Sequence, residues 1–431
     1  MSTRPSSQGR PVAAPDVALA ERLFDELRRR TSASRGVSRA SYGLGEQIAH
    51  DIVRREAERL GLDVFTDAAA NLHVVLPGAQ DGPAVVIGSH VDSVPMGGNF
   101  DGAAGVLLGL SVLAGVVAGG VVPPCPVRLL VIRAEESAWF GASYIGSRAA
   151  FGKLTPAELD EVRRVGDGVT LGAAIAAAGG DPQALAAGGA ALDPAGIRLF
   201  LEPHIEQGPV LLERGVPAGI VTGIRGSFRH RQARCLGAYA HSGATPRAGR
   251  QDAVLAVARL AVELDASWER RQAAGEDLTV TVGQIATDPD EASFSKIAGD
   301  VRFSLDIRSA EPATLAAMRE ELAGIVARIE ARERVRFDLG RLTASEPARM
   351  SGTVVSALGA AARAAGVAHI EMPCGAGHDA AVFAAEGVPT GMVFIRNAHG
   401  SHNPDEHMEL SDFAEAARLV MALVQDPPPA R

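Results

Sequence analysis

Short apolar runs that end in polar side chains constrain the fold of this chain most strongly. "AVVIGSH" (84–90) and "VRLLVIRAEE" (127–136) are rich in β-branched residues and finish in a histidine or in two acids. Such runs are typical of strands that are buried on both faces of a parallel sheet. Because the carboxyl ends of these strands meet at one edge of an open α/β sheet, we expect His90, Glu135 and Glu136 to lie near one another.

The order of helix and strand patterns changes along the chain, which at 431 residues is long enough for more than one hydrophobic core. Residues 1–16 are rich in proline and serine and are expected to be loose. From residue 220 the pattern becomes strand (220–236), helix (250–264), strand (278–286), strand (301–307), helix (313–333) and strand (335–342). This βαββαβ order predicts a two-layer unit over residues 220–343, inserted into an α/β domain of residues 17–219 and 344–431.

Composition narrows the class of protein. The net charge is −9 and no dense stripe of Lys and Arg occurs, which argues against a nucleic-acid partner. Cys125, Cys235 and Cys374 are far apart and odd in number, as in proteins of a reducing compartment, so we expect a cytoplasmic protein. The uncharged run from 102 to 127 is long enough to span a bilayer, but its glycines and the turn-like "GGVVPPCP" favour a buried helix followed by a turn, and no membrane partner.

Possible metal ligands occur in separated segments. The stretch "GSHVDSVPMGGNFDGAAGVLLGL" (88–110) places polar residues between two apolar runs, as a metal loop or simply a turn would. Imidazole and carboxylate groups without a nearby thiolate suit zinc, manganese or similar divalent ions. Each residue alone is weak evidence, but their joint pattern favours a metal site. The candidates are His90, Asp101, Glu135, Glu136, His204 and His402, with Asp92 placed to orient His90.

Seven motifs in sequence order resemble one family. They are "SHVDSVPMGGNFDGAAGV", "AEES", "HIEQGPVLLERG", "AHSGATPR", "FSLDIRS", "CGAGHDAAVFA" and "GSHNPDEHMEL". The chain resembles the M20 metallopeptidase-like amidohydrolases, in the branch of N-carbamoyl-L-amino-acid hydrolases, β-ureidopropionases and allantoate amidohydrolases. The resemblance implies an α/β catalytic domain, with a mixed β-sheet flanked by helices, that is interrupted by a ferredoxin-like βαββαβ lid and dimerisation domain.

The resemblance also implies a site with two divalent ions. Asp101 would bridge both ions, His90 and His204 would complete one ligand set, and Glu136 and His402 the other. Glu135 would be the general base, and Asp92 would orient His90. Mn²⁺ or Zn²⁺ is expected, and Co²⁺ and Ni²⁺ are also compatible. Two such ions about 3.5–4 Å apart activate water and polarise a carbonyl.

Further residues match substrate contacts of the family. His241 matches a histidine that reaches the active site of a partner subunit and stabilises an oxyanion, and Arg308 matches an arginine that binds the substrate carboxylate. From the residues alone, a turn histidine is the favoured explanation for His241, and an arginine after a strand is commonly a surface residue. The remaining matches are Gln207, Ser295 and the segment Gly375, Ala376 and Gly377, which could also mark an ordinary turn.

Several positions depart from the family pattern, among them Ser242 in "AHSG" and Arg247 in place of a usual methionine. Ser295 stands where relatives have an asparagine that helps to hold the substrate carboxylate, Asn99 replaces an arginine, and Trp139 is unusual after the glutamate pair. The metal set is intact, so we expect a homodimeric hydrolase that cleaves an N-carbamoyl (ureido) amino acid and releases ammonia, carbon dioxide and the amino acid. The alternatives are an allantoate-type amidohydrolase, an amidase for a related N-acyl compound, or a non-catalytic metal-binding relative, against which the retained Glu135 argues.

Overall fold

Two compact units make up the chain. The structure is a computed structural model, which describes residues 13–430, so all but the last four residues of the segment expected to be loose lie outside the described part. The first unit comprises Met1–Thr222 and Met350–Arg431, and the second comprises Gly223–Arg349. The predicted insertion, 220–343, begins and ends a few residues earlier than the observed second unit.

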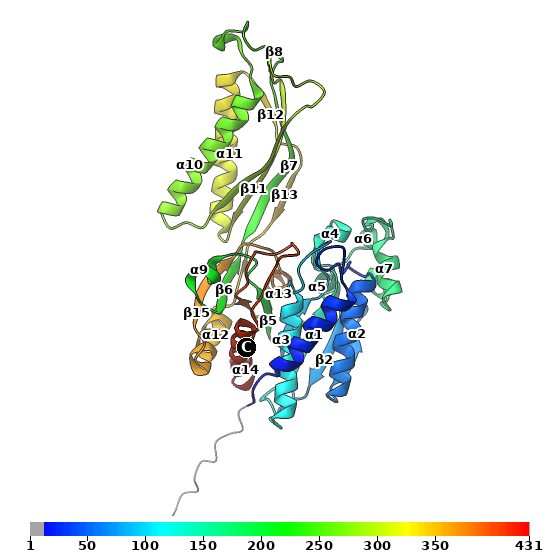
Figure 1. Cartoon of the computed structure of the whole chain (residues 1–431). Helices are drawn as coiled ribbons and strands as arrows, with labels where there is room; N and C mark the ends of the chain where they lie inside the picture. The colour runs from blue at the N-terminus through cyan, green and yellow to red at the C-terminus, as the bar shows by residue number, and fades with distance from the viewer. Residues whose placement is uncertain (1–12, 431) are drawn as a thin grey trace, which may run out of the picture. The chain divides into compact units, whose positions relative to one another are not determined.

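A nine-stranded mixed sheet forms the centre of the first unit (Figure 1). Its order is β1-β2-β4-β3-β5-β16-β6-β14, and β15 pairs with β6. The inner strands β4, β3, β5 and β16 are mutually parallel, whereas the outer pairs are antiparallel. The strands are β1 (Asp63–Thr66), β2 (Leu72–Leu76), β3 (Ala84–His90), β4 (Val127–Ile132), β5 (Ile197–Ile205), β6 (Ala218–Ile224), β14 (Ala348–Arg349), β15 (His369–Cys374) and β16 (Thr390–Ile395).

Helices cover both faces of this sheet, which explains why its inner strands are apolar without alternation. On one face, Val85 and Ile87 of β3 pack in a core with α1 (Val17–Arg30), α2 (Leu44–Arg59), α3 (Ala103–Ala118), α12 (Gly352–Ala365) and α14 (Leu410–Gln425). On the other face, Phe200 stacks on Phe383 of α13 with ring centroids 3.6 Å apart. The remaining helices are α4 (Ser137–Phe140), α5 (Ile145–Ala150), α6 (Pro156–Glu161), α7 (Leu171–Ala177), α8 (Pro182–Ala186), α9 (Val210–Arg214), α13 (Ala380–Ala385) and the 3₁₀ turn Pro194–Gly196.

The uncharged run after Asp101 forms α3. This helix is buried along almost its whole length against β3 and β5, so its lack of charge is a consequence of its central position. Within residues 13–430, the structure contains no helix that combines the length and the apolar character needed to cross a membrane.

The second unit is a five-stranded antiparallel sheet with two long helices on one face. Its order is β12-β7-β11-β9, with β13 also paired to β7, and its core lies between the sheet and the helices. The chain therefore follows the predicted βαββαβ order. The elements are β7 (Gly226–Leu236), β8 (Ala240–His241), the 3₁₀ turn Arg247–Gly249, α10 (Ala253–Ala273), β9 (Thr279–Thr287), β10 (Lys296–Ile297), β11 (Asp300–Ser309), α11 (Pro312–Glu333), β12 (Arg336–Asp338) and β13 (Leu342–Ser345).

Two predicted strands of this region are wrong in detail. The run 220–236 is not one strand, because β6 ends at Ile224 in the first sheet and β7 starts at Gly226 in the second. Only Arg225 separates these two strands, so the sequence offers no gap long enough to mark the change of sheet. The predicted strand 335–342 is also divided, because Gly340 has a φ of 64° and turns the chain between β12 and β13.

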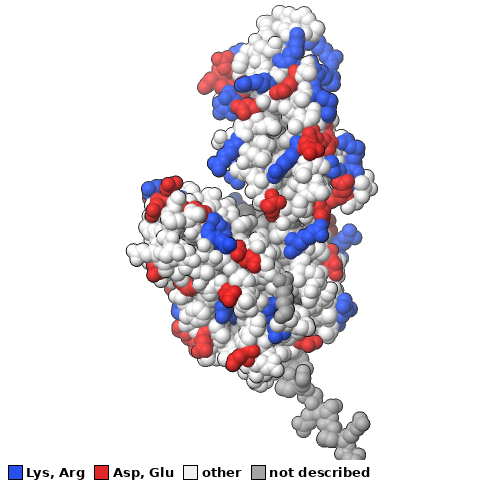
Figure 2. Space-filling model, turned by 180° about the vertical axis from the view of Figure 1, so that it is seen from behind, with Lys and Arg blue, Asp and Glu red and all other residues white. Residues whose placement is uncertain are grey.

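Charged side chains are intermingled on the surface. Figure 2 shows acidic and basic residues side by side over the face drawn. In the second unit, many arginines pair with acids across neighbouring elements, for example Arg259 with Glu333 and Arg270 with Glu321, both at 2.9 Å. These arginines are accordingly neutralised by the chain itself.

Candidate metal centre

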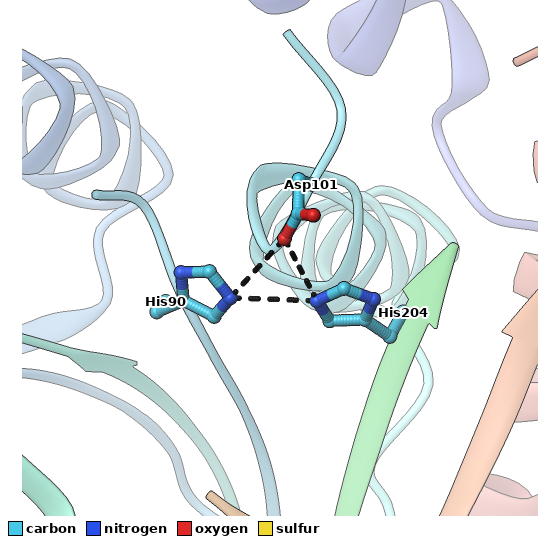
Figure 3. Close-up of side chains that lie close together, drawn as sticks. All are labelled: His90, Asp101 and His204. Carbon is cyan, nitrogen blue, oxygen red and sulfur yellow. Dashed lines mark hydrogen bonds and ion pairs between the residues drawn. The ribbon is translucent and has the colours of Figure 1, made fainter. Parts of the chain in front are cut away.

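Two histidines and one aspartate meet at the carboxyl edge of the first sheet (Figure 3). His90 ends β3, and His204 lies at the end of the neighbouring parallel strand β5. The Nε2 atoms of the two histidines are 3.4 Å apart. Asp101 Oδ1 lies 3.5 Å from His90 Nε2 and 3.2 Å from His204 Nε2. All three side chains are buried. The parallel pairing of β3 and β5 thus places the two histidines together.

Hydrogen bonds orient both imidazole rings. Nδ1 of His90 lies 3.2 Å from Asp92 Oδ1, and Nδ1 of His204 lies 2.8 Å from the carbonyl oxygen of Ile205. Because the carbonyl of Ile205 only accepts, Nδ1 of His204 is the donor, and Asp92 favours the same tautomer in His90. The Nε2 lone pairs of the two rings then point towards each other and towards a carboxylate. Such a convergence is repulsive unless a cation or protons lie between the three groups.

The start of α3 holds Asp101 against the histidines. Gly102 follows Asp101 with a φ of 63°, and a Cβ atom there would lie 2.4 Å from Cε1 of His90. Its N–H donates to His204 Nε2 at 3.1 Å. Only glycine combines this backbone conformation with such a close approach, so the "FDG" sequence is a geometric requirement of the cluster.

Asp101 also belongs to a second group of ligands. His402 Nε2 lies 3.3 Å from Glu136 Oε1 and 3.5 Å from Asp101 Oδ2. His402 has a φ of 59°, and its side chain is 51% exposed, whereas Glu136 is buried. Oδ1 of Asp101 therefore faces the two buried histidines, and Oδ2 faces the group of Glu136 and His402. Only the second group is open to solvent, through His402.

The electrostatics of the cluster match a cation. Burial lowers the pKa of His90, but the hydrogen bond with Asp92 and the charge of Glu135 outweigh it and raise that pKa well above its usual range. The hydrogen bond to Glu136 raises the pKa of His402 to about 9. Protons on His90 and His402 thus balance the negative charge of the carboxylates. Bound divalent ions would replace these protons. The nitrogen and oxygen donors of both groups fit zinc or manganese.

Glu135 lies beside the ligands but outside both groups. Its Oε2 is 3.9 Å from His90 Nε2. Burial, together with the charges of Glu136 and Asp379, raises the pKa of Glu135 well above its usual range. A buried carboxyl group with a raised pKa is suited to accept and release a proton.

The loop of the two glutamates is fixed by Asp92 and by two residues that the sequence did not predict, Ser41 and Glu46. Asp92 accepts from the N–H groups of Glu135 and Glu136, both at 3.2 Å, and from the Ser41 hydroxyl at 2.6 Å. Below the loop, Glu46 accepts from Ala134 N at 2.9 Å and from Arg133 Nη1 at 2.8 Å. Ser41 and Glu46 are distant in sequence from this loop. Glu46 occupies a polar position of α2 like that of many helices, so the local sequence pattern did not indicate either residue.

Residues expected to contact substrate in the first unit lie next to the cluster. Gln207, with a φ of 64°, donates from Nε2 to Asp101 Oδ2 at 2.7 Å. Gly375, Ala376 and Gly377 form the loop before His378, whose ring centroid is 4.4 Å from that of His204. Their position beside the ligands is compatible with a pocket wall.

The other expected substrate contacts, His241, Ser295 and Arg308, belong to the second unit. His241 on β8 pairs with Lys296 on β10, and the adjacent Ser295 accepts a backbone bond from Ser242 at 2.9 Å. His241 and Ser295 are therefore neighbours. Arg308 lies near the far end of β11 and forms an ion pair with Asp306 at 2.8 Å.

Two residues that depart from the family pattern, Asn99 and Trp139, form hydrogen bonds inside the first unit. The buried Arg39 donates from Nη1 to Asn99 Oδ1 at 3.2 Å, and Asn99 Nδ2 donates to the carbonyl of Phe24 at 3.0 Å. Trp139 Nε1 donates to the carbonyl of Ser93 at 2.7 Å. Both side chains thus stabilise loops around the candidate metal ligands.

The fold and the site define a family. The model of peptidase family M20/M25/M40 matches residues 86–426, and the chain belongs to this family. This confirms the resemblance predicted from the motifs and, with it, a hydrolase of carbon–nitrogen bonds.

Within the family, similar proteins are amidohydrolases. The N-carbamoyl-L-amino acid amidohydrolase of Geobacillus stearothermophilus is 37% identical over 393 residues, which cover 90% of this chain and 92% of that protein. The allantoate amidohydrolase of Escherichia coli K12 is 31% identical over 84% of this chain and 86% of its own length. Among solved structures, an amidase of the hydantoinase/carbamoylase family from Burkholderia multivorans matches with a TM-score of 0.86 and 29% identity, over 96% of this chain and 98% of that one.

Proposed function

We propose that this chain is a two-metal amidohydrolase that cleaves the carbon–nitrogen bond of an N-carbamoyl amino acid. The observation that supports this most is the position of Asp101, which is shared by two groups of ligands with Glu135 beside them. The similarity to an N-carbamoyl-L-amino acid amidohydrolase over 90% of the chain supports the substrate class.

His90, His204 and Asp101 would hold one ion, and Glu136, His402 and Asp101 the other. When bound, Mn²⁺ or Zn²⁺ ions polarise the attacked carbonyl and lower the pKa of a water molecule. Asp92 orients His90. By accepting from the backbone N–H groups of Glu135 and Glu136, it also fixes the backbone positions of both glutamates. The ligands and the base are therefore positioned by one carboxylate.

Glu135 transfers the proton. It takes a proton from the attacking water, whose oxygen forms a bond to the carbamoyl carbon, and it delivers that proton to the nitrogen of the amino acid as the C–N bond breaks. The products are the amino acid and carbamic acid, and the latter decomposes to ammonia and carbon dioxide. The net reaction consumes one water and needs no oxidant or reductant.

Substrate recognition is proposed for both units. Gln207 and the loop of Gly375, Ala376 and Gly377 would contact the ureido group, since they lie beside the ligands. Arg308 would bind the carboxylate of the amino acid, because a guanidinium forms two parallel hydrogen bonds with it. The hydroxyl of Ser295 would reach less far than the side-chain amide of the asparagine in relatives. This difference favours a changed position of the substrate carboxylate.

The distance between His241 and Arg308 supports the proposal of a homodimer through the second unit. The two lie at opposite ends of this unit, because residues 300–308 of β11 alone span about 26 Å at the usual rise per residue. A single copy of the unit therefore does not bring both side chains onto one small substrate. A second copy would supply His241, which would stabilise the oxyanion while Arg308 binds the carboxylate.

A second candidate is hydrolysis of allantoate, which also contains ureido groups. The 31% identity to an allantoate amidohydrolase and the serine at position 295 favour it. An amidase for a related N-acyl compound would use the same metal chemistry. For the cell compartment we propose the cytoplasm, because Cys125, Cys235 and Cys374 are far apart in the sequence and odd in number, as in proteins of a reducing compartment.

The experiment is hydrolysis of a panel of substrates, followed as ammonia release for the ureido compounds and as release of the free amine for the N-acyl amides. The protein, reconstituted with Mn²⁺ or Zn²⁺, is incubated with N-carbamoyl-L- and D-amino acids, N-carbamoyl-β-alanine, allantoate and simple N-acyl amides. Turnover of an N-carbamoyl amino acid supports the first candidate. Turnover of allantoate alone favours the second, and hydrolysis of simple amides alone overturns the ureido assignment.

A further inference from the structure

We propose that Glu406 is a positioning residue that fixes the solvent-facing metal ligands and thereby sets the affinity for one of the two ions. The inference rests on the proposed metal-dependent function. Glu406 lies four residues after His402 and is buried, although a free carboxylate is costly to bury. Both oxygens of Glu406 are therefore expected to accept hydrogen bonds, and both do.

One oxygen of Glu406 holds the segment of Asp101. Oε1 accepts from the N–H of Phe100 at 2.8 Å and from the N–H of Asp101 at 3.1 Å. Gly98 packs directly on the carboxylate, since a Cβ atom at that position would lie 2.2 Å from Oε1. Charge-assisted bonds to two successive backbone N–H groups fix the direction in which the chain approaches Asp101.

The other oxygen of Glu406 holds the segment of His402. Oε2 accepts from the hydroxyl of Ser401 at 2.7 Å, and this hydroxyl also contacts Asp101 Oδ2. The ends of this loop are closed by a backbone bridge between Ala398 and His407, so the backbone next to Glu406 is itself fixed. One carboxylate thus joins the two segments that provide Asp101 and His402.

The two groups of ligands depend on Glu406 to different degrees. His90 and His204 belong to strands of the central sheet, and their rings are held by Asp92 and by the carbonyl of Ile205. His402 belongs to a loop, its side chain is half exposed, and its neighbour Ser401 is bound to Glu406. Loss of Glu406 should therefore weaken the ion of Glu136 and His402 more than the ion of the two histidines.

Metal binding to stripped protein tests this. Isothermal titration with Mn²⁺ is compared for wild type, Glu406→Ala and Glu409→Ala, in which an exposed glutamate of the same segment is lost. We expect two ions in wild type and in Glu409→Ala, and a loss of about 10- to 100-fold in the affinity for one ion in Glu406→Ala. Glu406→Gln, whose carbonyl oxygen can still accept from Phe100 and Asp101, should recover most of this affinity.

The identity of the weakened ion is established with His402→Ala. If Glu406 acts through the His402 loop, Glu406→Ala adds little to the loss in a His402→Ala background, whereas independent effects would add. Circular dichroism checks that each variant is folded. Should Glu406→Ala not fold, Ser401→Ala removes just the bridging hydroxyl and should weaken the same ion.

A folded Glu406→Ala variant that binds both ions with wild-type affinity would overturn the inference. So would equal weakening of both ions. If wild-type protein binds no Mn²⁺ or Zn²⁺ at all, the proposed function itself fails, and this outcome is distinct from the other two.

Discussion

Oδ1 of Asp92 lies 3.2 Å from Nδ1 of His90, on the side of the imidazole that faces away from the other ligands. The same carboxylate accepts from the backbone of Glu135 and Glu136. Asp92 thus connects the end of β3 with the loop after β4, and it relates the orientation of the candidate ligand His90 to the position of the proposed base Glu135.

Asp92→Asn should weaken the metal centre. An amide has one acceptor oxygen instead of two, so one of the contacts to His90, Glu135 or Glu136 is lost. We expect metal affinity to fall by about 10- to 100-fold. Equilibrium dialysis followed by elemental analysis measures this, with the exposed Asp81→Asn as the matched control. Unchanged metal content at limiting Mn²⁺ would contradict the role of Asp92.

Glu135→Gln should separate catalysis from metal binding. Glutamine keeps the shape of the side chain but cannot accept a proton, and Glu135 lies outside both groups of ligands. Turnover should fall by about 10²- to 10⁴-fold, while metal content and thermal stability stay near wild type. A variant with near-native turnover would exclude Glu135 as the base.

Mixing two inactive variants tests whether His241 acts in the active site of a second copy. His241→Ala and Glu135→Gln should each be poorly active. If the proposed dimer combines Glu135 of one subunit with His241 of the other, equal mixing after subunit exchange restores about a quarter of wild-type activity. No gain over the separate variants, in a mixture shown to contain heterodimers, would place His241 outside the partner's site.

Arg308→Ala should raise KM for substrates with a carboxylate, because a charge-assisted contact is lost. We expect an increase of about tenfold or more, with a smaller change in kcat. Arg302→Ala, which removes an exposed arginine of the same strand, is the control. An unchanged KM would indicate that the substrate has no carboxylate at this position.

His50 should make the first unit sensitive to acid. It is buried in α2, and burial, together with the charge of Arg133, lowers the pKa of His50 well below its usual value. The unfolded chain binds the proton near pH 6.5 whereas the folded chain does not. Stability is therefore fully present above about pH 6.5 and is lost as the pH falls below it.

His50→Leu should lose less thermal stability between about pH 7.5 and pH 5.5 than wild type. The comparison is the difference in Tm between the two pH values, measured by circular dichroism. His369→Gln, at a half-buried site, controls for the loss of a histidine as such. An equal loss of Tm in wild type and His50→Leu would contradict a neutral buried imidazole.

Sequence patterns were sufficient where a residue follows a buried strand. His90, Glu135, Glu136 and His204 all lie at strand ends, and parallel pairing of β3, β4 and β5 brings them together without further information. The repeated order of helix and strand likewise predicted the second unit, except where the chain changes sheets across the single residue Arg225.

Supporting contacts could not be predicted in this way. Glu406, Ser41 and Glu46 each act on backbone N–H groups or side chains far away in sequence, for example Glu406 on Phe100. A polar residue on a helix or loop has the same local pattern whether it faces water or a distant backbone. Its partner is determined only when the whole sheet has formed.

The most direct test of the two-metal account is ammonia release during metal titration. Protein stripped by a chelator is titrated with Mn²⁺, and the rate with the best N-carbamoyl substrate is recorded against ions bound. The account predicts negligible release without metal and full activity when two ions are bound per chain. Release that persists after complete removal of metal, or no release from any ureido or amide substrate with both ions bound, would contradict it.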